Sequence, residues 1–82
     1  MTRADELLRG VEIAIAGDWD EAHEIAQRHE GDEMADWLHA VLHKIEGDAG
    51  NARYWYRRCG KLELVGNDAA AELQSIRESL KR

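Results

Sequence analysis

Two of the three Gly-Asp pairs in this chain, at residues 17–18 and 47–48, constrain its fold more than any other feature. Each pair lies between two segments in which apolar residues recur every three to four positions, the spacing of an amphipathic helix. A glycine just past one helix and an aspartate at the start of the next are common stop and start signals. Because the chain also contains no proline, we expect an all-α protein.

The same signals predict five helices in a single domain of 82 residues, 1–82. Thr2, Asp18 and Asp48 stand at N-cap positions, and either Asn67 or Asp68 caps the last helix. The segment 61–66 is predicted as either a helical turn or a short extended link. On the last helix we expect Glu72 to face solvent. The predicted helices cover residues 3–16, 18–29, 33–46, 48–59 and 67–81.

Composition narrows the classes of function. The net charge is −6, from 17 acidic and 11 basic residues, which disfavours nucleic-acid binding. No apolar run is long enough to span a membrane, and the first residues do not resemble a signal sequence. The single cysteine, Cys59, excludes an internal disulfide framework. We therefore expect a cytoplasmic protein without a cofactor, and no catalytic motif predicts an enzyme.

The Gly-Asp pairs also mark an internal repeat. Gly17 and Gly47 are 30 residues apart, and each is preceded by one amphipathic helix and followed by another. A unit of two helices therefore occurs twice. Small residues recur with the same spacing, seven before and five after each glycine: Gly10 and Ala40, then Ala22 and Ala52.

This pattern resembles the tetratricopeptide repeat, with one repeat at about residues 3–30 and a second at about 33–60. Tyr56 and Cys59 match the aromatic and small positions of the family's second helix, where Ala26 and His29 stand in the first repeat. The resemblance implies a right-handed stack of two helical hairpins, with residues 67–81 as a capping helix. The chain departs from the family in its period of 30 residues rather than about 34, and it lacks the usual proline.

In the tetratricopeptide family, the first helices of successive repeats line a concave groove that binds peptides. The resemblance therefore implies protein or peptide binding, or self-association into a homodimer, through an apolar groove. Such a surface is too apolar to stay open on a small monomer, so either the fifth helix or a second copy of the chain should cover it. The residues predicted to line this groove are Leu7, Val11, Trp37, Val41, Lys44 and Ile45.

Histidines on the third predicted helix suggest an alternative function. His39 and His43 are four residues apart, Glu46 follows three residues later, and His23 can approach from the second helix. Imidazoles at this spacing can share a metal ion, and a carboxylate can join them. Two other interpretations stay open: either His39 and His43 hydrogen-bond across the hairpin, where the family has its leucine and tyrosine, or they lie on a solvated face. The alternative prediction is thus a metal-binding helical protein.

A second candidate site is a basic patch on the fourth predicted helix. Arg53, Arg57, Arg58 and Lys61 lie near Tyr54 and could hold an acidic peptide or a phosphate group. Equally, these cations can pair with acidic residues of the same chain or remain solvated. The neighbouring Cys59 is predicted to be a buried apolar residue rather than a nucleophile.

Overall fold

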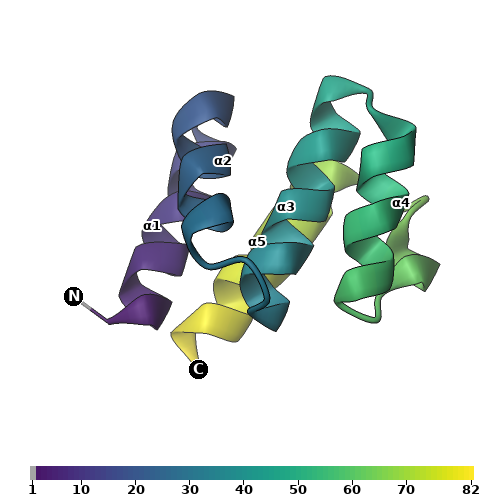
Figure 1. Ribbon diagram of the computed structural model, residues 1–82. Coiled ribbons are helices and arrows are strands. Elements are labelled where there is room, and N and C mark those ends of the chain that lie inside the picture. Colours follow the sequence, from purple (N-terminus) through teal and green to yellow (C-terminus); the bar gives the residue numbers. More distant parts are fainter. Residues whose placement is uncertain (1) are drawn as a thin grey trace.

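The computed structural model describes residues 2–82 as five α-helices and one short 3₁₀ turn, which confirms the all-α prediction (Figure 1). Each predicted helix is present within two residues of its expected ends. The segment after Gly60 contains a single turn of 3₁₀ helix. The elements are α1 (Arg3–Ile15), α2 (Trp19–Arg28), α3 (Glu33–Glu46), α4 (Ala49–Arg58), η1 (Leu62–Leu64) and α5 (Ala69–Lys81).

Side-chain caps explain where the five α-helices begin. The residue before each helix accepts a hydrogen bond from a backbone N–H in the first turn, which would otherwise lack a partner. At α1 the cap is reciprocal, because the Asp5 carboxylate accepts from the Thr2 backbone N–H while the Thr2 hydroxyl accepts from Asp5. The capping residues are Thr2, Asp18, Asp32, Asp48 and Asp68.

The Gly-Asp pairs form the two tight turns between α1 and α2 and between α3 and α4. Gly17 has φ 99° and Gly47 has φ 88°. Glycine adopts this left-handed conformation without the steric cost that a Cβ atom would bring. The aspartate that follows immediately caps the next helix, so the chain reverses direction within three residues.

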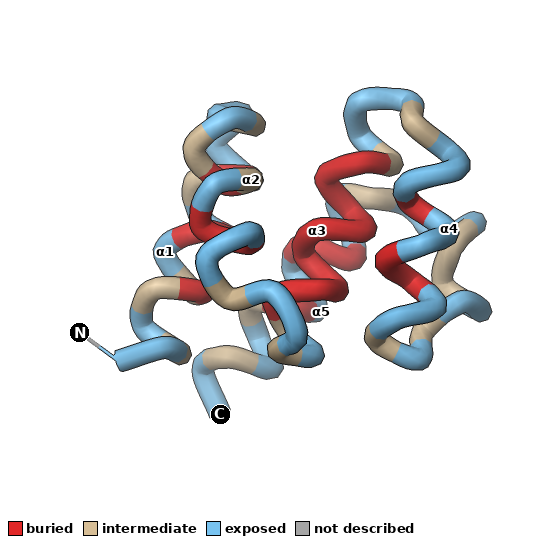
Figure 2. The backbone as a smooth tube through the Cα atoms, in the orientation of Figure 1, coloured by how far each residue is buried: buried red, intermediate tan, exposed pale blue. Residues whose placement is uncertain are grey.

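Helices α1 to α4 alternate in direction, and α5 passes behind α3 (Figure 1) and contacts α1 as well. α3 is the central element, since it contacts the other four α-helices. Every residue from 35 to 43 of α3 is buried, which is why this helix is largely red in Figure 2. Polar residues on a helix that is buried on all sides need hydrogen-bond partners within the protein.

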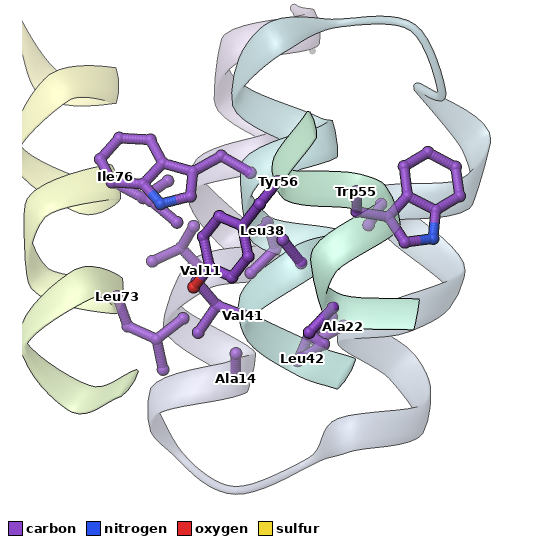
Figure 3. Close-up of a cluster of buried hydrophobic side chains, with 14 residues drawn as sticks. Val11, Ala14, Ala22, Leu38, Val41, Leu42, Trp55, Tyr56, Leu73 and Ile76 are labelled. Atoms are coloured by element: carbon purple, nitrogen blue, oxygen red, sulfur yellow. The ribbon is translucent and has the colours of Figure 1, made fainter. Parts of the chain in front are cut away.

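The main apolar core contains buried residues from all five α-helices, with the largest share from α3. In Figure 3, Val11, Val41 and Tyr56 approach Leu73 and Ile76 of α5, whereas Trp55 lies away from α5 on the other side of the cluster. Cys59 is half-buried against this core rather than fully buried.

The fifth helix covers the face that the tetratricopeptide resemblance predicts to be a groove. Leu7, Val11, Trp37 and Val41 are 0–7% exposed, and α5 contacts both helices that carry them. Of the two predicted covers, the fifth helix of the same chain therefore occupies this face. Ile45 alone among the predicted apolar groove residues stays exposed, at 48%.

A buried carboxylate holds α5 in place, which corrects the prediction that Glu72 faces solvent. Glu72 is 3% exposed. It accepts hydrogen bonds from Trp37 Nε1 at 3.1 Å and from the Tyr56 hydroxyl at 2.8 Å, and it forms an ion pair with Lys44. Lys44 Nζ also donates to the carbonyl oxygens of Leu64 and Asn67, at 3.1 and 2.7 Å. These residues are called the Glu72 network below.

Across residues 2–82, none of the helices is both long enough and apolar enough to cross a membrane.

Candidate metal centre

Three histidines from two helices meet where α2 packs against α3. His23 comes from α2, and His39 and His43 come from successive turns of α3. One ring nitrogen from each lies within 4.8 Å of the others. The Nε2 atoms of His23 and His39 are 3.0 Å apart and form a hydrogen bond. The structure thus brings together the three histidines of the alternative sequence prediction, which are called the histidine cluster below.

The burial of the cluster decides between two of the sequence interpretations. His39 is 3% exposed and His43 is 8% exposed, whereas His23 is half-buried. The prediction of a solvated face is therefore wrong, because α2 and α4 cover this side of the central helix. The bond between His23 and His39 does not run across the hairpin of α3 and α4; it joins α2 to α3.

Two tryptophans fix the imidazole rings. Trp19 stacks on His23 with ring centroids 4.5 Å apart, and Trp55 stacks on His39 at 3.9 Å. The indole N–H of Trp19 donates to the Leu42 carbonyl oxygen at 2.6 Å, which ties the start of α2 to α3. Trp19 precedes His23 by four residues, and this spacing on one helix was the available signal that the two rings meet.

Glu46 contacts the cluster through His43. Its Oε2 atom lies 2.7 Å from His43 Nδ1, three residues earlier on the same helix. A carboxylate in this place fixes the Nδ1–H tautomer, so the lone pair of Nε2 is available to a ligand. His43, Glu46 and Asp48 also form a second group of potential ligands within 4.8 Å, on the solvent side of the same helix end.

Burial disfavours the charged forms of His39 and His23. Loss of hydration lowers the pKa of His39 to about 3, and the nearby His23 and His43 add to that effect. Loss of hydration also lowers the pKa of His23, with a further contribution from His43, while Glu46 and Asp20 oppose the shift. Neutral imidazole is the form that binds metal ions.

His39 adds an uncompensated cost to the core. Its Nδ1 atom is buried and has no hydrogen-bond partner within the described residues. A buried polar group without a partner costs about 1–3 kcal/mol, which an apolar side chain at this position would avoid. Stability alone therefore does not account for a histidine here, and such local costs are typical of functional positions.

The basic patch is divided between paired and exposed cations. Arg58 lies 3.8 Å from a carboxylate oxygen of Glu30, and Lys61 lies 3.3 Å from one of Glu33. Both cations also lie over tryptophan rings: Arg58 is 4.9 Å from Trp55, and Lys61 is 4.7 Å from Trp37. Arg53 and Arg57 are exposed. The pairing agrees with the interpretation in which the patch binds acidic residues of its own chain.

Comparisons with protein-family models, with curated proteins and with solved structures found no match to this chain. The candidate centre consequently rests on its own geometry. Three converging imidazoles, one oriented by a carboxylate, form the most specific arrangement of chemical groups among residues 2–82.

Proposed function

We propose that this protein binds a divalent transition-metal ion of the zinc class through His23, His39 and His43. The observation that carries the proposal is the convergence of three ring nitrogens within 4.8 Å, from two helices. In a tetrahedral zinc site, Zn–N bonds of about 2.0–2.1 Å place ligand nitrogens about 3.3 Å apart. The 3.0 Å separation of the His23 and His39 nitrogens is already close to this value.

The chemistry of the surroundings suits such an ion. Imidazole nitrogen binds zinc, copper and nickel well, whereas magnesium and calcium prefer oxygen ligands. The Glu46–His43 pair reproduces the carboxylate–histidine arrangement that commonly orients a metal-bound imidazole. Asp20 and Glu46 act electrostatically on His23, so negative charge borders the half-exposed side of the cluster. This charge favours the approach of a cation.

Partner binding through the predicted groove is less well supported. Four of its six residues are buried beneath α5. A peptide or a second chain could reach them only after α5 had left its place and the Glu72 network had been broken. Protein binding and homodimer formation therefore stay predictions from the tetratricopeptide resemblance.

We also propose that α1–α2 and α3–α4 are a pair of tetratricopeptide-like hairpins. Support comes from the close approach of α1 and α2 at Gly10, where the family has a small residue. A Cβ atom on Gly10 would lie 2.9 Å from Ile25 Cγ2 of α2. The equivalent position of the second unit, Ala40, is fully buried.

The metal proposal is tested by titrating zinc into untagged, chelator-treated protein by isothermal calorimetry. We expect the wild-type chain to bind one ion. We expect His23→Gln and His43→Gln to bind at least about tenfold more weakly, since changes even to outer residues of metal sites cost about 10–100-fold. His29→Gln is the matched control, because His29 is the remaining histidine and pairs with Glu6 at 3.0 Å, outside the cluster. Far-ultraviolet circular dichroism verifies that each variant is folded.

Two results would refute the proposal. One is the absence of zinc uptake by wild-type protein. The other is equal uptake by the wild type and both cluster variants, which would assign the ion to a different part of the chain.

A further inference from the structure

The two carboxylates that group with His43 already have partners of their own. Glu46 Oε2 is bonded to His43 Nδ1 at 2.7 Å. Asp48 caps α4, where its oxygens accept from the Asn51 backbone N–H at 3.2 Å and from the Asn51 side-chain amide at 2.7 Å. Although both carboxylates group with His43, neither belongs to the group formed by the three histidines.

The cluster is enclosed on one side and accessible on the other. His39 and His43 are buried, and His39 is covered by the stacked ring of Trp55. His23 is half-buried and Glu46 is exposed. An ion held by the three nitrogens would therefore have its remaining coordination position toward solvent, between α2 and the C-terminal end of α3.

The rings are also held against rearrangement. Trp19 is stacked on His23 and bonded to the Leu42 carbonyl oxygen, so α2 cannot easily shift toward α3 to bring in another ligand. Closed structural zinc sites have four protein ligands, whereas sites with three protein ligands keep a position for water or another small ligand.

We infer that the metal centre keeps one coordination position open to a small exogenous ligand, namely water or a small anion that displaces it. This inference rests on the proposed metal-binding function. It assigns Glu46 to orientation of His43 rather than to the ion. It also places the centre in the chemical class of sites that can bind and polarise a small molecule, rather than in the class of purely structural zinc sites.

The test uses the full chain loaded with cobalt(II), whose visible absorption reports its coordination. Sodium azide is then titrated into the loaded protein as the probe anion. We expect a saturable change in the visible spectrum with one azide bound per cobalt ion. In Glu46→Gln we expect cobalt affinity to fall by about 10–100-fold, while azide still changes the spectrum once the site is loaded.

The outcomes separate the two proposals. If cobalt produces no protein-dependent spectrum, the metal-binding function itself fails. If cobalt binds but azide leaves the spectrum unchanged while circular dichroism shows an intact fold, the site is closed and the open-position inference is wrong. Sedimentation of the loaded protein as a dimer, together with an azide-insensitive spectrum, would also overturn it, because a second chain would then supply the fourth ligand. Loss of the azide response in Glu46→Gln alone would contradict the role assigned to Glu46.

Discussion

Replacing Glu72 by alanine should remove most of the attachment of α5 to the rest of the molecule. The carboxylate is almost completely buried, with 4% of its side chain exposed, and it pairs with Lys44, whose side chain is 18% exposed. It also accepts from Trp37 Nε1 and from the Tyr56 hydroxyl. The substitution therefore leaves three donors without their acceptor, one of them a charged ammonium group.

The magnitude follows from these contacts. Removing one partner of a buried ion pair typically costs 3–5 kcal/mol, because the remaining charge stays desolvated. Lys44 retains two carbonyl acceptors, at Leu64 and Asn67, which places the expected loss near the lower bound, about 3 kcal/mol. A domain of 82 residues has a total stability of roughly 4–12 kcal/mol. Glu72→Ala should therefore lose a large part of its free energy of unfolding.

The assay is urea denaturation followed by circular dichroism, with Glu78→Ala as the matched control on the exposed side of α5. A double-mutant cycle with Lys44→Met isolates the ion pair. We expect the double variant to be less destabilised than the sum of the single changes, because both charges are then absent from the interior. A loss below about 1 kcal/mol in Glu72→Ala would refute the reasoning, since it would match an exposed ion pair.

Three further changes probe the core and the histidine cluster. Gly10→Ala should lower the free energy of unfolding by about 1 kcal/mol, because overpacking against Ile25 Cγ2 at 2.9 Å outweighs the better helix propensity of alanine. Ile25→Leu removes that methyl group and should restore urea resistance in the double variant, whereas a Gly10→Ala protein as stable as wild type would contradict the close approach. In chelator-treated protein, lowering the pH from about 7.5 to about 5 should reduce the free energy of unfolding by about 2 kcal/mol through His39, because the unfolded histidine takes up a proton below about pH 6.5 while the folded one does not until about pH 3. Urea titrations of wild type and His39→Phe measure the difference, and equal pH dependence in both proteins would contradict it. Zinc at about 100 times its dissociation constant should stabilise the wild type by about 2.7 kcal/mol, or roughly 10–20 °C in Tm, but should not stabilise His43→Gln in the same calorimetric scan.

The helices were predictable from the sequence because local signals determine them. Thr2 and the aspartates at 18, 48 and 68 cap the helices that follow, and the left-handed glycines at 17 and 47 end those that precede them. Each of these signals acts within about four residues of the chain. Neighbouring residues are therefore sufficient to place such helix ends.

The environment of Glu72 could not be predicted in the same way. Its three donors come from α3 and α4, between 16 and 35 residues away in the sequence. On the helical wheel Glu72 borders the apolar stripe, since it precedes the buried Ile76 by four residues. That position allows either burial or exposure, and only the packing of α5 against the central helix decides between them.

The histidine cluster shows a related limit. The spacing of His39 and His43 indicated a shared face, but it could not show whether that face met water or another helix. The burial of residues 35–43 from every side decides this point, and it depends on how α2, α4 and α5 all pack around α3. The approach of His23 depends on the angle between α2 and α3, which no local signal in the sequence determines.

The two polar clusters attach α3 to its neighbours on opposite sides. At about 100° per residue, Trp37 and Lys44 face one side of this helix and His39 and His43 face the other. The Glu72 network connects the first side to α5, and the histidine cluster connects the second side to α2. An ion in the histidine cluster would therefore join the first pair of helices to the second across the short 29–32 link. Because the two clusters share no residue, metal binding should stabilise the α2–α3 junction without requiring any movement of α5.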